Sequence, residues 1–259
     1  SGAEAAQASH NLRNLLNCNY TDMDHYLNFA YTYPWLLNKN KALVKTCRTS
    51  PTVCHNPEFL STFCRLFPFQ TLKAVRLRLN LTKEFLKDNK LGVQVLLLVR
   101  DPRGTMQSRK SRHKWCTGNP PCDDPANLCQ DLVDDYNTAI EFRREFPNSF
   151  KVVRYEDVSF DVYNKTKELL DFFHLSYDSR MEDFLDTHTK NDKDKKASST
   201  FRDSKTAPIH WRSELSWNEV EKIQKVCNKA LSLWGYESAK DEEHLRTFDP
   251  VGMLGSFDR

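Results

Sequence analysis

The sequence predicts an α/β fold in which a parallel sheet is flanked by helices. Residues 93–99 form a nearly unbroken apolar run rich in β-branched side chains, which is typical of a strand buried on both faces of a parallel sheet. A second buried strand is expected over residues 150–155. Helical patterns alternate with these runs, and a strand, helix, strand order favours parallel pairing. With 259 residues the chain can bury one sizeable core, so a single domain over residues 1–259 is expected.

The first ninety residues are expected to contain three helices and one strand. Gln70 to Leu79, which reads QTLKAVRLRL, alternates between apolar and polar residues as a strand does, and this places Lys73 and Arg76 near one edge of the sheet. Residues 39–56 have the character of a loop. Helices are expected from their apolar spacing at residues 3–18, 57–67 and 81–89.

The second half of the chain is expected to be mostly helical. Residues 114–128 contain Gly118, three prolines and two cysteines, with Cys129 directly after them, and they are expected to form a pinned loop. Residues 187–204 are the most polar stretch, which is typical of a mobile loop. The last long helix should end at Gly235 as its C-cap. Helices are expected at residues 131–146, 162–173 and 211–234, and a further helix is expected to begin near residue 177.

Composition indicates the cellular compartment of the protein and the class of partner that it binds. The net charge is only +3 and charges of both signs are interspersed, so no nucleic-acid partner is indicated. Eight cysteines lack the C-x-x-C spacing of zinc sites, and three N-x-T sequons, at Asn19, Asn80 and Asn164, accompany them. Together they favour an oxidising secretory lumen. The pairing stays open, since Cys47 and Cys54 could be bridged to each other or to other cysteines.

The strand at residues 93–99 leads directly into a candidate anion site. Asp101 can cap a new helix, Pro102 suits the first helical position, and Gly104 lets a bound group approach the backbone. Free N–H groups and the helix dipole make such a helix start attractive to anions. Arg100 stands where a phosphate would bind, and Ser108 lies on the same helical face.

The segment LLLVRDPRGTMQSR closely resembles the 3′-phosphate-binding strand, turn and helix of sulfotransferases, specifically of the Golgi carbohydrate 6-O-sulfotransferases. The resemblance implies a P-loop NTPase-like sulfotransferase fold. It also implies that Arg100 and Ser108 hold the 3′-phosphate of PAPS (3′-phosphoadenylyl sulfate), the sulfonate donor. The competing interpretation is a buried strand followed by a solvated basic helix.

Three further segments carry the resemblance. The RYED segment implies that Tyr155 contacts the adenine of the donor, although a tyrosine packed at a strand end is the alternative. Thr200 and Arg202 match a flexible ST-x-R-x-S core that closes over the donor, and a solvated loop is its alternative. Lys73 and Arg76 match a KxxRL strand, where they would steer the donor or an acidic glycan or would simply be solvated cations.

The chemistry implied by the family is sulfonyl transfer from PAPS to a sugar hydroxyl of a glycan or glycosaminoglycan. The expected acceptor is the 6-hydroxyl of galactose, GlcNAc or GalNAc. An in-line displacement needs positioning, cationic stabilisation and a base, and it requires no metal or covalent nucleophile. The family's 5′-phosphosulfate loop of RSGSS type is absent, and its candidate base, a glutamate that follows that loop, goes with it. The catalytic base is therefore unknown within this chain.

These gaps lead to expectations about the whole protein. We expect the chain to be the later part of a type II Golgi membrane protein whose N-terminal anchor is missing. Its catalytic part is expected in the Golgi lumen. Ser1 and Gly2 are expected to be residues left by cloning. A non-catalytic PAPS- or glycan-binding protein of the secretory pathway is the alternative. A nucleotide kinase is disfavoured because no G-x-x-x-x-G-K-[ST] loop is present among only seven glycines.

Overall fold

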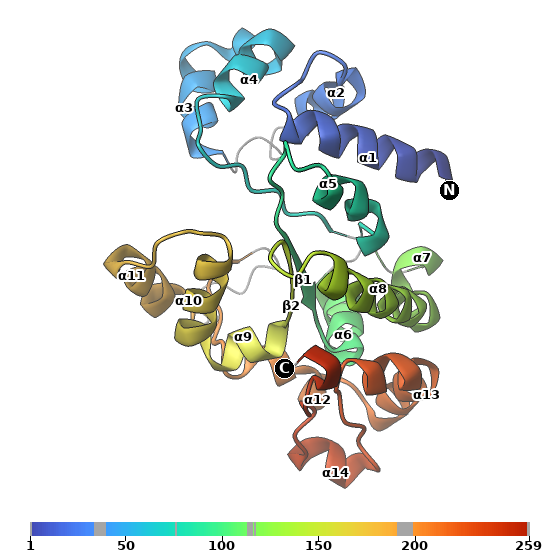
Figure 1. Cartoon of the computed structure of the whole chain (residues 1–259). Coiled ribbons are helices and arrows are strands. Elements are labelled where there is room, and N and C mark those ends of the chain that lie inside the picture. The colour runs from blue at the N-terminus through green and yellow to red at the C-terminus, as the bar shows by residue number, and fades with distance from the viewer. Residues whose placement is uncertain are drawn as a thin grey trace. The chain divides into compact units, whose positions relative to one another are not determined.

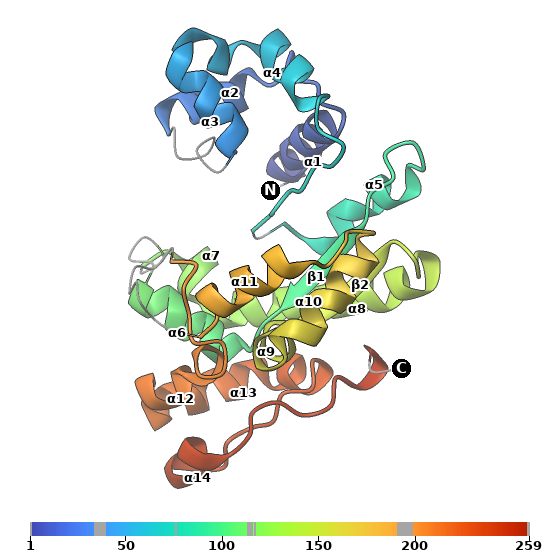
Figure 2. The same cartoon turned by 90° about the vertical axis from the view of Figure 1, so that its left-hand side faces the viewer.

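The computed structural model describes residues 2–33, 40–75, 77–112, 116, 118–190 and 199–257. Contacts divide the chain into two compact units, Ser1–Val93 and Gln94–Arg259 (Figures 1 and 2). The expectation of a single domain stays a prediction. Within the described residues, no helix is both long and apolar enough to cross a membrane.

The first unit is built from short helices in its described part. Its core contains Leu27, Leu43 and Leu60, with aromatic side chains packed around them. Two disulfides, Cys18–Cys64 and Cys47–Cys54, hold these helices together. The elements are α1 (Gly2–Leu16), α2 (Asp24–Thr32), α3 (Lys41–Thr49), η2 (Pro51–His55), α4 (Pro57–Cys64), η3 (Leu79–Thr82) and α5 (Lys83–Lys87).

The expectation of a loop over residues 39–56 is wrong. Asn40 caps α3 because its side chain accepts a hydrogen bond from the Leu43 N–H at 3.0 Å. Leu43 is buried in the core of the first unit, and the Cys47–Cys54 bridge closes the following turn. The polar composition of this stretch hid a helix that packing and a disulfide stabilise.

The strand predicted for residues 70–79 is also wrong. The described residues from Gln70 to Val75 have no regular secondary structure, and their side chains are all exposed. A strand needs a hydrogen-bonded neighbour and usually a face to bury, and alternation in sequence supplies neither. The segment then enters η3 at Leu79.

The second unit contains the predicted parallel sheet. Strand β1 (Val95–Val99) pairs in parallel with β2 (Phe150–Arg154), with Val95 opposite Phe150 and Val99 opposite Arg154. Helices α10 (Val162–Phe172) and α11 (Ser179–His188) lie on one side of this pair, and α6 (Pro102–Arg112) and α8 (Pro125–Glu145) lie on the other (Figures 1 and 2). The predicted α/β class with helices on both sides of a parallel sheet is confirmed.

Long helices of the second unit support the sheet from one side. The N-terminus of α13 carries a capping box formed by Ser216 and Glu219, and the helix is followed by Gly235 at a φ of 68°, as predicted for its C-cap. The Cys129–Cys227 disulfide joins α8 to α13. The helices are α6 (Pro102–Arg112), α7 (Pro120–Asp123), α8 (Pro125–Glu145), α9 (Tyr155–Phe160), α10 (Val162–Phe172), α11 (Ser179–His188), η4 (Ala207–Ile209), α12 (Trp211–Glu214), α13 (Trp217–Leu233), α14 (Glu242–Thr247) and η5 (Gly255–Phe257).

Candidate functional site

The turn between β1 and α6 has the geometry that its sequence predicts. The carboxylate Oδ1 of Asp101 accepts a hydrogen bond from the Arg103 N–H at 2.8 Å, and the Asp101 carbonyl accepts from the Thr105 N–H at 2.9 Å. Pro102 is the first residue of α6. Asp101 therefore caps a helix of eleven residues, whose dipole and first N–H groups favour a bound anion at this end.

Arg100 and Tyr155 lie together at the carboxyl ends of the two strands. The guanidinium carbon of Arg100 is 4.7 Å from the centroid of the Tyr155 ring. Val99 is paired with Arg154 in the parallel register. Arg100 directly follows Val99 and Tyr155 directly follows Arg154, which explains their contact. A cation over a tyrosine face is held in place without losing its N–H donors.

The Arg100 side chain retains donor capacity. Its Nε is buried and has no hydrogen-bond partner among the described residues. Gly104 leaves the space beside it, since an added Cβ would lie 3.5 Å from Arg100 Nε and only 3.0 Å from Trp211 Cδ1. A buried donor without a partner costs free energy unless a ligand satisfies it, so this corner fits an anion such as a phosphate.

Arg103, three residues further on, has a different role that the sequence did not reveal. It is fully buried and donates to both carboxylate oxygens of Asp101, with Nη2 2.8 Å from Oδ2. Its Nη1 donates to Gln224 on α13 at 2.8 Å, and the guanidinium carbon lies 4.4 Å from the Trp211 ring centroid. Arg103 therefore fixes the turn to the rest of the unit, whereas the Nε of Arg100 has no hydrogen-bond partner in the part of the chain that the structure describes.

A buried carboxyl group lies beneath the turn. Glu156 is 1% exposed, and its Oε1 accepts a hydrogen bond from the Asp101 N–H at 3.1 Å. Its Oε2 accepts from the Tyr236 hydroxyl at 2.7 Å. Burial, followed by the nearby charge of Asp101, raises the pKa of Glu156 to about 7, although both donated hydrogen bonds act in the opposite direction. The acidic pair after β2 was visible in the sequence, but its contact with the turn was not.

Stability should depend on pH through Glu156. Its pKa is about 7 in the folded protein and about 4.5 in the unfolded chain, so its contribution is fully present below pH 4.5 and is lost as the pH rises through 7. The difference corresponds to about 3 kcal/mol. Denaturant unfolding at pH 5 and pH 8 should show this loss in the native chain and not in the Glu156→Gln variant. The same loss in both proteins would contradict the assignment.

Glu219 acts in a different pH range and does not obscure this test. Its ion pair with Lys110 and its hydrogen bonds from Ser216 lower its pKa to about 2. Its contribution is therefore present above pH 4.5 and is lost as the pH falls towards 2. The window between pH 5 and pH 8 isolates Glu156 from Glu219.

Ser108 lies in the second turn of α6 and is half-buried. It follows Gly104 by four residues, so the two share one face of the helix. Its Cα is about 9 Å along the axis from Pro102, and helical side chains lean towards the N-terminus. The hydroxyl is thus directed along the face that leads to Arg100, and its contact with a phosphate stays a prediction.

The segment that carries Thr200 and Arg202 is anchored on the end of α11. The Arg202 N–H donates to the His188 carbonyl at 2.9 Å, and Lys190 and Asp203 form an antiparallel bridge. The His188 ring is stacked between Phe184 and Phe201, at 4.0 and 4.3 Å between centroids. Thr200 is exposed, and Arg202 Nη1 donates to the Phe201 carbonyl at 2.7 Å. The roles of both residues in donor binding stay predictions.

The two predicted acceptor or steering residues belong to the first unit. Lys73 is exposed in the irregular segment after α4, so its expected place on a sheet edge is wrong. Arg76 lies outside the described residues. Their predicted contacts with a donor or glycan stay predictions.

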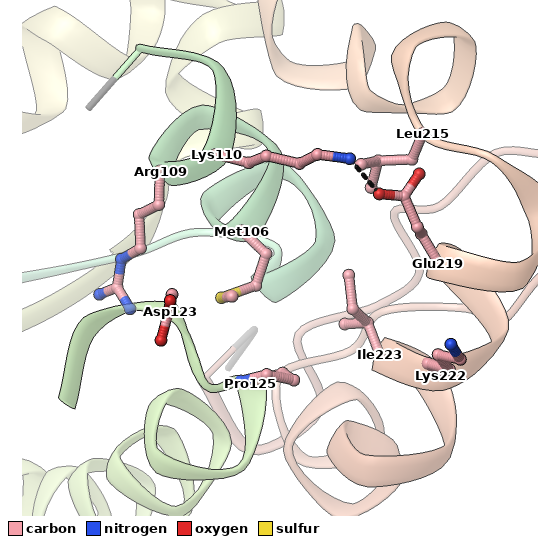
Figure 3. A pocket seen from close by; sticks show the side chains of 9 residues that line it. All are labelled: Met106, Arg109, Lys110, Asp123, Pro125, Leu215, Glu219, Lys222 and Ile223. Atoms are coloured by element: carbon pink, nitrogen blue, oxygen red, sulfur yellow. Dashed lines mark hydrogen bonds and ion pairs between the residues drawn. The ribbon is translucent and has the colours of Figure 1, made fainter. Parts of the chain in front are cut away.

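A cavity of about 300 Å³ lies on another face of α6 (Figure 3). That face presents Met106, Arg109 and Lys110. The opposite face, which presents Gly104 and Ser108, is directed towards the turn at residues 100–104, called the anion turn below. Lys110 and Glu219 form an ion pair across this cavity (Figure 3). The cavity and the predicted donor site are therefore separate. Its lining residues are Met106, Arg109, Lys110, Asp123, Pro125, Leu215, Glu219, Lys222 and Ile223.

Comparison with known proteins places this strand, turn and helix in a family. A family model described as a sulfotransferase domain matches residues 68–235. The chain belongs to the sulfotransferase family. Its match includes the anion turn, the Tyr155 strand end and the α13 helix of this sulfotransferase domain.

The curated relatives are carbohydrate sulfotransferases. Carbohydrate sulfotransferase 1 of Danio rerio is 30% identical over 200 residues, which cover 71% of this chain and 48% of the relative. The human protein of the same name is 28% identical over 199 residues, covering 71% and 48%. Carbohydrate sulfotransferase 3 of Mus musculus is 26% identical over 212 residues, covering 75% and 45%. The chain thus spans about half the length of these relatives. No solved structure matches it.

Proposed function

We propose that this chain carries the 3′-phosphate half of the donor site of a carbohydrate sulfotransferase. The enzyme transfers the sulfonate group of PAPS to a sugar hydroxyl of a glycan or glycosaminoglycan, and the 6-hydroxyl of galactose, GlcNAc or GalNAc is the proposed acceptor. The observation that carries the proposal is the Arg100 guanidinium. It lies over Tyr155 at the start of α6 with a buried Nε that no described residue satisfies.

The turn fits a nucleotide phosphate in charge and in shape. Arg100 supplies a planar cationic donor set, the helix start supplies N–H groups, and Gly104 leaves the backbone accessible. Tyr155 provides an aromatic ring beside Arg100 at the carboxyl end of β2, where the adenine of the donor is proposed to lie. Ser108 is proposed to add one neutral hydrogen bond, and Arg202 with Thr200 is proposed to close over the donor from the segment after α11.

The proposed location is the lumen of the Golgi. Four disulfides include all eight cysteines of the sequence. Disulfides persist in oxidising compartments and are rare in the cytosol.

The described residues contain no cluster of three or more His, Cys, Asp or Glu side chains suited to a metal. The proposed reaction draws on positioning and cationic groups, and its base stays unassigned.

Binding of PAP, the desulfated product, tests the donor site directly. Arg100→Ala should weaken PAP binding by about 2 kcal/mol, or roughly 30-fold, because one charge-assisted contact is lost. Ser108→Ala removes a neutral hydrogen bond and should weaken PAP binding by about 1 kcal/mol, or roughly fivefold. Isothermal titration calorimetry of PAP against the native chain and both variants measures these changes.

Arg180→Ala is the matched control, since Arg180 pairs with its neighbour Asp178 at the exposed start of α11. Its PAP affinity should equal that of the native chain. Equal affinity of Arg100→Ala and the native chain would overturn the assignment of Arg100. PAP binding without sulfonate transfer, even in the full-length protein, would favour the non-catalytic binding protein over the enzyme.

A further inference from the structure

Glu156 holds the point at which strand β1 becomes the anion turn. The N–H that donates to its Oε1 belongs to the peptide bond between Arg100 and Asp101. The other oxygen is fixed by the Tyr236 hydroxyl, just beyond the Gly235 cap of α13. The orientation of the Arg100 backbone is therefore set by a buried carboxyl group that reaches it from α9.

Several charged groups surround Glu156. Asp101, in the turn, is the like charge, and its own partner is Arg103 of α6. Arg154 is at the end of β2, and its guanidinium carbon lies 5.7 Å from the centroid of the Tyr236 ring. It forms an ion pair with Asp157. Segment η4, which packs against α9, has no ionisable side chain, and α10 has no buried residue, so its ionisable groups are solvated. An anion bound at the turn would add a second negative charge near Glu156.

We propose that Glu156 is a positioning residue for phosphate binding: it holds the Arg100–Asp101 peptide in place and takes up a proton when the anion binds. The proton comes from solvent and no bond of the ligand changes. It can be placed on Oε2, and the hydrogen bond there then reverses: the carboxyl group donates to the Tyr236 oxygen, whose own hydrogen turns away, while Oε1 continues to accept from the Asp101 N–H. Proton uptake removes the like-charge repulsion that the anion would otherwise meet. The inference rests on the proposed function in that the anion is the 3′-phosphate of the donor.

Two variants separate the roles of shape and charge. Glu156→Gln keeps an oxygen for the Asp101 N–H and is neutral, so its PAP affinity at pH 8 should equal or exceed that of the native chain. Glu156→Ala leaves that N–H without a partner, and its PAP affinity should fall about tenfold. Asp157→Asn is the matched control, because Asp157 pairs with Arg154 and does not contact the turn. Its PAP affinity should be unchanged.

The decisive measurement is the number of protons taken up on binding. PAP is titrated at pH 7.5 in two buffers with different ionisation enthalpies, and denaturant unfolding of each variant confirms that it is folded. The native chain should take up more protons than Glu156→Gln. The variant serves as the reference, because protons that bind to the phosphates of PAP itself are counted equally in both proteins. A purely structural glutamate would not produce this difference.

The outcomes distinguish the inference from the proposed function. Equal proton uptake by the native chain and Glu156→Gln would overturn the inference while PAP binding still supports the donor site. Unchanged PAP affinity in folded Glu156→Ala would overturn the positioning role. A native chain that is folded and binds no PAP at millimolar concentration would overturn both the donor site and the inference that rests on it.

Discussion

Replacing Arg103 with methionine is expected to lower the free energy of unfolding of the second unit by about 3–5 kcal/mol. The change leaves the Asp101 carboxylate buried, at 1% exposed, without its cationic partner. It also removes the donor to Gln224 and the contact of the guanidinium with Trp211. The loss is large because a buried charge without a partner cannot be compensated by water. Urea or guanidinium unfolding followed by circular dichroism measures it.

Two control variants test the cause of this loss. Lys110→Met, on the same helix as Arg103, breaks a solvent-accessible ion pair with Glu219 of α13 and should cost less than about 1 kcal/mol. Asp101→Asn combined with Arg103→Met removes both buried charges and keeps a side-chain oxygen for the cap, so it should be more stable than Arg103→Met alone. If the double variant were the less stable of the two, the unpaired carboxylate would not be the source of the loss.

Removing the disulfide between α8 and α13 is expected to cost about 5 kcal/mol of stability. Cys129 and Cys227 are 98 residues apart in sequence, so their bond closes a long loop and strongly restricts the unfolded chain. Both cysteines are buried, and alanine is the better replacement because a serine hydroxyl would need a partner there. Denaturant unfolding of Cys129→Ala with Cys227→Ala, compared with the native chain under non-reducing conditions, gives the change.

The Cys116–Cys122 bridge of the same unit provides the comparison. It closes a separation of only six residues, so its removal through Cys116→Ala with Cys122→Ala should cost about 2 kcal/mol. Equal losses for the two pairs would show that loop length does not determine their contribution. In that case packing around the sulfur atoms would be the better explanation.

Local chemistry in the sequence determined the core of the site. The apolar run before Arg100, the capping residue Asp101 and the small residue Gly104 act within about ten residues of one another. Short-range geometry therefore predicted a strand, a turn and a helix start, and each was confirmed. The expected burial of the strand on both faces was wrong, since Leu98 is exposed and only Val99 of the strand is fully buried. The C-cap at Gly235 was predicted for the same reason, since helices commonly end at a glycine with a positive φ.

Alternation without a partner misled the prediction for residues 70–79. The period of two was present, but a strand forms only where a neighbour supplies hydrogen bonds, and that is a property of the fold. The opposite error occurred at residues 39–56, where burial of Leu43 and the Cys47–Cys54 bond stabilise helix in a polar stretch. Pairing of the eight cysteines was likewise beyond the sequence.

The tertiary structure alone decided which arginine of the motif is available to a ligand. Arg100 and Arg103 are only three residues apart and chemically identical, yet the partners of Arg103 include Gln224, 121 residues away. In the same way Glu156 reaches the turn across a separation of 55 residues, and Tyr236 reaches Glu156 across 80. Sequence specified the strand, turn and helix because those depend on neighbouring residues. Side-chain roles at the site were decided by contacts between distant segments, which form only when the chain is folded.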